Sequence, residues 1–242
     1  MSHFFGWKPD KPDIRDVYFA TPEMGTLPTS VDLRPQCPPV YDQGQLGSCT
    51  ANAIAAHLDF NRNEQKEKLI FPSRLFIYFN ERSDDGDVNS DGGSSIRESA
   101  KTVAKNGACP ESEWPYNTKL FTVRPAQVCY TDGVKYEALK YFRLKQTEAD
   151  MKGCLAQGFP FVCGVTVYES FEASDGAVPM PSTSENLMGG HAILIVGYTQ
   201  DEWIFRNSWG TSWGYSGYGT LPKDYLLNPD LSDDRWTLRS VK

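Results

Sequence analysis

The chain has 242 residues and a formal net charge of −7, with 40% hydrophobic and 23% charged residues, which is ordinary for one soluble globular domain or two lobes around a shared interface. The acidic balance argues against a nucleic-acid partner, because phosphate binding relies on clustered Lys and Arg. No stretch approaches the roughly 20 apolar residues of a membrane span, so no membrane partner is expected, and the lack of a signal-peptide run at residues 1–10 slightly favours the cytoplasm.

Residues 1–26 form a distinct first segment. It contains Pro9, Pro12 and Pro22 with charged residues between them. Proline disfavours the helical conformation of the residue before it, so this spacing predicts an extended and irregular segment.

The next part of the chain predicts three helices. An alanine-rich helix is expected over residues 49–63, and Ser73 is a plausible N-cap for a second helix that runs to Arg82. A third helix is expected over 95–105, because Asn-Gly follows it. The stretch 84–95 is dense in Asp, Gly, Asn and Ser, which predicts a loop. Its acidic residues lack the calcium-loop spacing, and no Cys/His cluster has zinc spacing, so no metal site is expected.

The second half predicts mainly strands. Runs rich in β-branched and aromatic residues suggest strands, and a short helix is expected over 148–156. Helices first and strands second predict an α+β chain. The expected strands cover residues 136–143, 159–168, 191–197, 203–207 and 217–221.

Three side chains in this order suit thiol-based acyl transfer: Cys49, His191 and Asn207. Gly47-Ser48 predicts a turn that places Cys49 at a helix N-terminus, where the macrodipole favours an anion. A protonated His191 beside it would favour the thiolate further, so we expect a lowered thiol pKa. Asn207 would fix the tautomer and direction of the imidazole.

The segments around these residues resemble the papain family of cysteine peptidases. His191 lies 142 residues after Cys49, which matches the spacing typical of that family. Two positions depart from the family pattern, since Leu46 stands where many members have a disulfide-bonded Cys and Thr50 where an aromatic is usual. The likeness is carried by residues 27–34, 42–53, 91–93, 114–116, 189–198 and 206–214.

The resemblance implies a papain-like two-lobe fold, in which a helical lobe bearing Cys49 faces a β-rich lobe bearing His191 and Asn207 across a substrate cleft. It implies a cysteine endopeptidase that acts on a peptide or protein through a thioester, as a monomer without a cofactor. Gln43 matches the family's oxyanion donor. The residues expected along the cleft are Gly92, Gly93, Gly190 and Trp209, the last of which would shield the His191–Asn207 hydrogen bond.

The resemblance also divides the chain into an N-terminal extension, 1–26, and a papain-like catalytic domain, 27–242. The extension is shorter than the family's helical propeptide, so it is either an arm packed on the domain surface or a strap over the cleft. Transfer of the acyl group to an amine and an inactive binding module are alternative functions. The other cysteines serve packing or possible bridges, and their odd number leaves at least one free: Cys37, Cys109, Cys129, Cys154 and Cys163.

Overall fold

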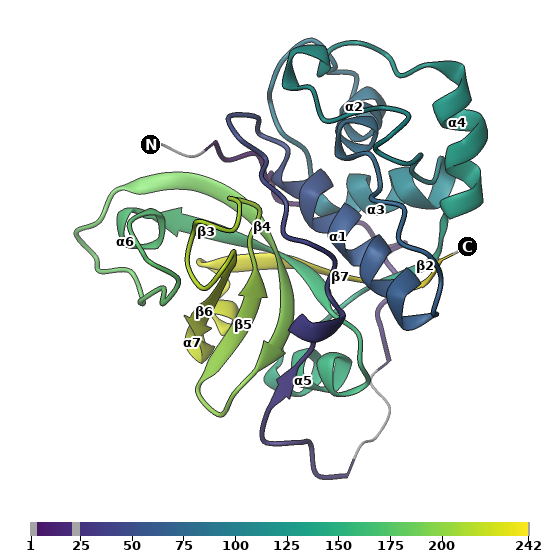
Figure 1. Cartoon of the computed structure of the whole chain (residues 1–242). Coiled ribbons are helices and arrows are strands. Elements are labelled where there is room, and N and C mark those ends of the chain that lie inside the picture. The colour runs from purple at the N-terminus through teal and green to yellow at the C-terminus, as the bar shows by residue number, and fades with distance from the viewer. Residues whose placement is uncertain (1–3, 21–24, 242) are drawn as a thin grey trace.

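The computed structural model describes residues 4–20 and 25–241, so parts of the 1–26 extension, namely 1–3 and 21–24, lie outside the described residues. The chain folds into a helical lobe and a sheet lobe, which confirms the α+β class (Figure 1). The main helices of the first lobe are α1 (Cys49–Glu64), α2 (Arg74–Asp84), α3 (Ile96–Lys105) and α4 (Gln127–Gly133).

The second lobe is built on a seven-stranded sheet in which every pairing is antiparallel. Six strands follow the order β2-β7-β3-β4-β5-β6, and β1 pairs with β4 outside this path. The strands are β1 (Val31–Asp32), β2 (Ala138–Arg143), β3 (Phe161–Tyr168), β4 (Leu187–Tyr198), β5 (Glu202–Arg206), β6 (Tyr218–Pro222) and β7 (Ser232–Val241). The helices of this half are α5 (Glu148–Ala156), α6 (Glu169–Glu172) and α7 (Lys223–Leu227).

The N-cap predicted at Ser73 is confirmed, and Ser95, which was expected to be the first residue of the third helix, is the N-cap of that helix. The Ser73 side chain accepts a hydrogen bond from the Phe76 N–H, and the Ser95 side chain accepts one from the Glu98 N–H. Each cap satisfies a backbone donor that the first turn of a helix leaves without an intrahelical partner. A serine side chain within three residues of the N–H group that it caps therefore defines the start of each helix.

Three elements of the sheet differ from the sequence-based expectation, the first of which is the two-residue strand β1, which was not predicted. Strand β4 begins at Leu187, four residues before His191, because Gly189 and Gly190 pair with Val167 and Thr166 of β3. Glycine is depleted in strands, so the sequence did not predict that the strand begins before His191. Strand β7 was missed, since its first residues are polar and charged, and Asp234 adopts a positive φ of 54°.

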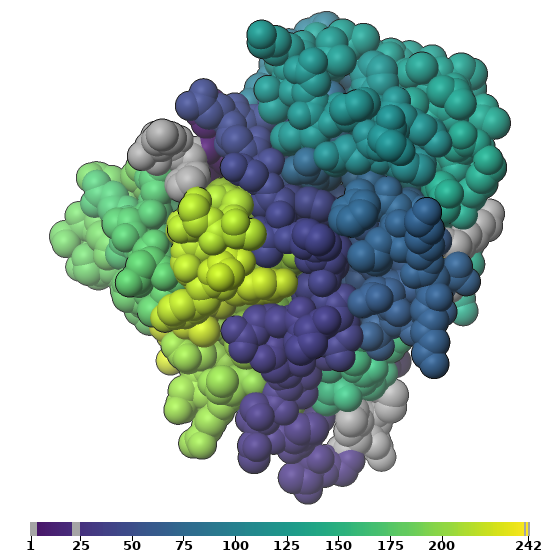
Figure 2. Space-filling model, viewed as in Figure 1, coloured from purple at the N-terminus to yellow at the C-terminus, as the bar shows by residue number. Residues whose placement is uncertain are grey.

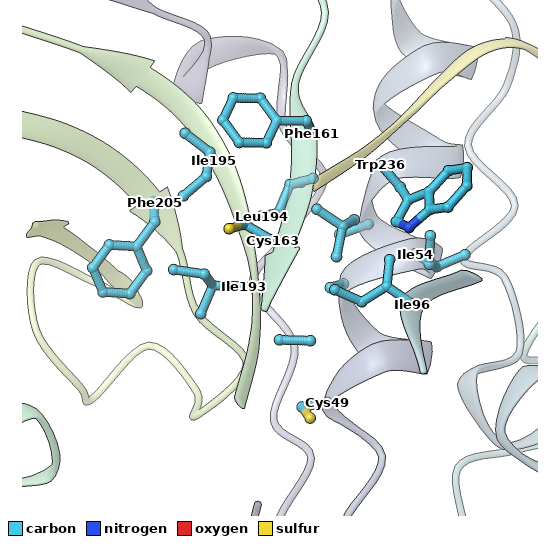
Figure 3. Packing of buried hydrophobic residues seen from close by; sticks show 14 of the residues in the cluster. Cys49, Ile54, Ile96, Phe161, Cys163, Ile193, Leu194, Ile195, Phe205 and Trp236 are labelled. Atoms are coloured by element: carbon cyan, nitrogen blue, oxygen red, sulfur yellow. The ribbon is translucent and has the colours of Figure 1, made fainter. Parts of the chain in front are cut away.

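Helix α1 lies where the two lobes meet. All its residues from Cys49 to Arg62 are buried, and its inner face packs against β4 (Figure 3). Ile54 of α1 lies in one core cluster with Ile193 and Leu194 of β4. The buried interface fixes the N-terminus of α1 against the sheet lobe.

The lobes are also joined on the face seen in Figure 2. There the chain near residue 210 packs against the chain near residue 41. Asp42 forms a β-bridge with Trp209, and the Gly210 N–H donates to the Tyr41 carbonyl at 3.0 Å. The loop that contains Asp42 and the loop that contains Trp209 are thus hydrogen bonded to each other.

Residues 4–20 of the N-terminal extension contain no helix or strand, as the prolines predict. It runs along both lobes, with isolated bridges from Trp7 to Ser94 and from Tyr18 to Arg143. Within residues 4–20 and 25–241, every helix is too short or too polar to span a bilayer.

Candidate active site

The candidate nucleophile, Cys49, is the first residue of α1 and is fully buried. Backbone hydrogen-bonding groups of Ala192 in β4, of Gly6 in the N-terminal segment and of Thr50 act on its thiol. Burial raises the pKa of Cys49 to about 11, and these hydrogen bonds only partly oppose the rise. The expected lowering of this pKa is therefore wrong for the chain in this conformation.

The candidate base, His191, lies inside β4 and next to Ala192. Its Nε2 forms a 2.8 Å hydrogen bond with Oδ1 of Asn207, which directly follows β5. The Trp209 ring stacks on the imidazole with a centroid distance of 4.9 Å and an interplanar angle of 26°. Because all three side chains are buried, the hydrogen bond is shielded from water.

Gln43 points its side-chain amide into the same site. Its Oε1 accepts a 2.6 Å hydrogen bond from the Ser208 hydroxyl, and its Nε2 donates to the carbonyl oxygens of Leu46 and Phe4, each at 3.0 Å. Because Oε1 of Gln43 faces Ser208, the Nε2 end of the amide faces the Leu46 and Phe4 carbonyls. The sequence analysis missed Ser208, although its position directly after Asn207 was a usable signal.

Asp91 supports the turn that precedes the nucleophile. Both of its carboxylate oxygens accept from the Gly47 N–H at 3.0 Å, and one also accepts from the Tyr78 hydroxyl. Leu46 stands beside this contact, at the position where many family members carry a disulfide-bonded Cys. A carboxylate and a tyrosine therefore hold the turn here. All six cysteines lie within the described residues and are free thiols.

The N-terminal segment occupies the site. Phe5 packs edge-on against His191 and Trp209, with centroid distances of 6.2 and 6.3 Å. A Cβ atom on Gly6 would lie 1.8 Å from the Gly47 carbonyl oxygen, so only glycine permits this approach. The Trp7 N–H donates to the Gly190 carbonyl at 3.0 Å. Residues 4–7 thus cover the groups that the sequence analysis assigned to catalysis.

The segment pairs with Ser94 on the helical lobe. The Ser94 N–H donates to the Gly6 carbonyl at 2.9 Å, and the Lys8 N–H donates to the Ser94 carbonyl at 3.0 Å, in a parallel bridge. Gly93 is in close contact with the backbone of Gly6, since a Cβ atom on Gly93 would lie 1.9 Å from the Gly6 carbonyl oxygen. Gly92 lies closer to the side chains of Lys8, Asp87 and Ser90 than to the segment's backbone. The backbone of the N-terminal segment therefore pairs with Ser94, the residue that follows Gly92 and Gly93.

The Trp7 side chain fills a pocket in the sheet lobe. Gly164 of β3 forms one wall, where an added Cβ atom would lie 2.1 Å from the indole ring. The indole N–H donates to Oδ2 of Asp234 in β7 at 3.2 Å. The sequence gave no sign of this contact between residues 227 positions apart.

One group of described residues could hold a metal ion away from this cleft. The sulfur atoms of Cys109 and Cys129 and a carboxylate oxygen of Glu113 all lie within 4.8 Å of one another. Burial and the neighbouring thiol raise the pKa of Cys109, so a metal would have to displace a tightly held proton. Cys109 lies in the loop after α3 and Cys129 in α4, which is why sequence spacing did not show the group.

Comparisons with known proteins point to one family. The family model described as papain family cysteine protease matches residues 27–228. A peptidase C1-like protein of Acanthamoeba polyphaga mimivirus is 38% identical over all of this chain and 88% of its own length. A cathepsin B-like protein of Giardia intestinalis is 30% identical over 86% of this chain and 73% of its own length. Some relatives are longer, since the chain spans 63% of cysteine proteinase 3 of Entamoeba histolytica.

Solved structures show the same fold. Xylellain, a cysteine protease from Xylella fastidiosa, matches with a TM-score of 0.94 and 40% identity, over 98% of this chain and 96% of its own. Procathepsin B of Trypanosoma congolense matches with a TM-score of 0.80 and 19% identity, over 99% of this chain and 87% of its own. The expected papain-like fold is therefore confirmed.

Proposed function

We propose that this chain, which belongs to the papain family of cysteine proteases, cleaves internal peptide bonds with the Cys49 thiolate as nucleophile. His191 acts as general acid and base, and Asn207 orients its imidazole. The observation that carries the proposal is the buried 2.8 Å hydrogen bond between His191 and Asn207 under Trp209, next to the β4 residue that contacts the Cys49 thiol.

The first half of the reaction forms a thioester. The Cys49 proton passes to the imidazole, and the sulfur attacks the carbonyl carbon of the substrate. The resulting oxyanion is stabilised by the Gln43 side-chain amide and by the backbone N–H of Cys49, which has no intrahelical partner at the start of α1. The C–N bond then breaks as His191 donates its proton to the leaving amine.

The second half releases the acyl group. His191 takes a proton from water, the hydroxide oxygen attacks the thioester carbon, and the C–S bond breaks to return the thiolate. Because Nε2 of His191 bonds to Asn207, the other ring nitrogen, Nδ1, carries the proton in these transfers. Gly190 and Trp209 border the substrate, and Gly92 and Gly93 lie beneath its path.

We also propose that residues 1–26 form a strap over the cleft of a catalytic domain made of residues 27–242. Support comes from Phe4, whose carbonyl accepts a hydrogen bond from Gln43 where a substrate carbonyl would do so. It also comes from the complete burial of Cys49 and from the Trp7 ring beside Gly164. In this proposal the strap and a peptide substrate exclude each other.

Labelling with an epoxysuccinyl thiol-peptidase inhibitor tests both proposals. Intact-mass and peptide mapping would compare the parent chain, Trp7→Ala and Cys49→Ala. We expect one adduct on Cys49, formed at least about tenfold faster in Trp7→Ala, and none in Cys49→Ala. Failure to label the folded Trp7→Ala variant would contradict the peptidase proposal, whereas equal rates in the parent and Trp7→Ala would contradict the strap.

A further inference from the structure

We propose that Cys109, Cys129 and Glu113 bind a zinc ion, which clamps the loop after α3 onto α4. These side chains lie in the helical lobe, where α4 forms an outer edge away from the sheet (Figure 1). Neither the cleft nor the proposed peptidase chemistry uses them, so the site goes beyond the proposed function and is independent of it.

The three ligands come from two segments that are each held in place by backbone hydrogen bonds. The Ser73 N–H, at the start of α2, donates to the Cys109 carbonyl at 2.8 Å, and the Glu113 N–H donates to the Pro110 carbonyl at 2.9 Å. Cys129 lies in the first turn of α4. The turn that carries Cys109 and Glu113 is therefore fixed to α2, while the third ligand is fixed in its own helix.

Close backbone packing brings the two segments together. Gly107 has a positive φ of 62°, and a Cβ atom on it would lie 1.8 Å from the carbonyl oxygen of Gly133 in α4, so only glycine permits this approach. A Cβ atom on Gly133 would in turn lie 2.7 Å from the Asn106 carbonyl oxygen. The loop after α3 therefore lies against α4 before any ion binds.

The donor atoms suit zinc. Tetrahedral zinc takes Zn–S distances of about 2.3 Å and Zn–O distances of about 2.0–2.2 Å, which places its ligand atoms roughly 3.5–3.8 Å apart. The two sulfur atoms of Cys109 and Cys129 and a carboxylate oxygen of Glu113 all lie within 4.8 Å of one another, so small side-chain rotations complete the site. Two sulfur ligands disfavour Ca²⁺ and Mg²⁺, which prefer oxygen, and the fourth position is left to water.

The two thiols are arranged differently from other buried thiols of the chain. Cys154 and Cys163 donate to backbone carbonyl oxygens at 3.3 and 3.4 Å. The Cys109 thiol instead faces the Cys129 thiol, and Phe76 packs in one apolar cluster with both. One S–H group can donate to the other sulfur, which leaves the second proton without such an acceptor. A zinc ion replaces both protons and bonds to both sulfur atoms.

Negative charge gathers beside the thiols. The carboxyl group of Asp132 in α4 faces that of Glu113, and burial together with this neighbour raises the pKa of Glu113. Lys135 pairs with Asp132, but the lysine side chain is 62% exposed, so solvent screens its charge. Two adjacent carboxyl groups favour a cation between them and their surroundings. A disulfide between Cys109 and Cys129 would leave this charge uncompensated, whereas Zn²⁺ compensates for it.

Titration with Co²⁺, a spectroscopic probe for zinc sites, tests the proposal. The reduced full chain carries Cys49→Ala, which removes the active-site thiol that would otherwise bind the probe as well, and the titration is carried out without oxygen. Thiolate ligands give a sulfur-to-cobalt charge-transfer band, and tetrahedral geometry gives intense visible bands. We expect both signatures at one Co²⁺ per chain and their loss when Zn²⁺ is added.

Variants in the same background assign the ligands. Cys109→Ser and Cys129→Ser should each weaken Co²⁺ binding at least about tenfold, because even the loss of a residue that only supports a ligand costs about 10–100-fold. Cys37→Ser is the matched control, since its half-buried thiol lies outside the group and binding should be unchanged. Glu113→Gln changes an exposed side chain and should also weaken binding at least about tenfold.

Three results would overturn the site. The first is the absence of the charge-transfer band in the reduced, folded chain, and the second is equal affinity in Cys37→Ser and the two cluster variants. The third is a Cys109–Cys129 disulfide that forms in air despite saturating Zn²⁺, as found by peptide mapping, because zinc-bound thiolates resist oxidation. If the two cluster variants fail to fold, unchanged affinity in Glu113→Gln would overturn the site instead.

Discussion

The side-chain amide of Gln43 donates a 3.0 Å hydrogen bond to the carbonyl oxygen of Phe4, a residue of the chain's own N-terminal segment. The same amide is held by Ser208 through its Oε1 atom, so its N–H groups are aimed before any substrate arrives. Preorganised donors need no rearrangement when charge develops on an oxygen, which is why such groups stabilise transition states.

Gln43→Ala should therefore lower kcat far more than it changes KM. Loss of one oxyanion donor costs about 10²–10³ in kcat. Steady-state kinetics on a peptide substrate, in the Trp7→Ala background that exposes the cleft, would measure the split. Cys49 alkylation serves as the control, because the thiol does not need Gln43 to react with a small reagent. A loss confined to KM would contradict the assignment.

Ser208→Ala should produce a smaller loss of the same kind. Without the 2.6 Å hydrogen bond, the Gln43 amide can turn and present its oxygen to the substrate carbonyl. We expect about a tenfold reduction in kcat, well below the effect of a lost donor. Ser208→Thr keeps the hydroxyl and should restore part of the activity. An unchanged kcat in Ser208→Ala would show that the amide is positioned by other contacts.

Gly164→Ala should open the cleft while leaving the catalytic residues intact. The added methyl group would lie 2.1 Å from the Trp7 ring, so the ring has to leave its pocket. Cys49 alkylation is expected to accelerate at least about tenfold, since overpacking typically costs about 1–3 kcal/mol and the strap is the part free to move. Gly25→Ala is the control, because no atom lies within 4 Å of its added Cβ. Equal rates in the two variants would indicate that Trp7 does not anchor the strap.

Glu81 should make the stability of the fold depend on pH. Its buried carboxyl group accepts hydrogen bonds from Thr50, which follows the nucleophile, and from Ser99, and burial raises its pKa to about 8. The folded chain therefore binds a proton that the unfolded chain releases above about pH 4.5. This proton-linked stabilisation is complete below that pH and is lost as the pH rises through about 8.

Urea unfolding of the parent and of Glu81→Gln at pH 5, 7 and 9 would test this. We expect the parent to lose free energy of unfolding from pH 5 to pH 9 relative to Glu81→Gln, by at most about 1.4 kcal/mol per pH unit. The variant keeps the shape of the side chain and lacks the titration. Parallel pH profiles would show that Glu81 is not protonated in the folded chain.

The sequence by itself determined the features that short segments encode. Ser73 and Ser95 mark helix starts because a cap needs only the next three residues, and the Gly47-Ser48 turn placed Cys49 at the start of α1. The triad candidates were named from their order and flanking residues, and Gln43 from the likeness to the papain family. The papain-like fold expected from that likeness is confirmed.

The tertiary structure alone decided what fills the cleft and how the thiol is tuned. The sequence left residues 1–26 as either an arm or a strap, because proline spacing predicts an extended chain and not its destination. The approach of Trp7 to Gly164 and Asp234 depends on the packing of three distant segments, and no local pattern records it. The pKa of Cys49 shows the same dependence: the helix terminus and His191 predicted a lowered value, but burial raises it to about 11. Desolvation is a property of the assembled fold, so it can be evaluated only once the neighbours of a group are known.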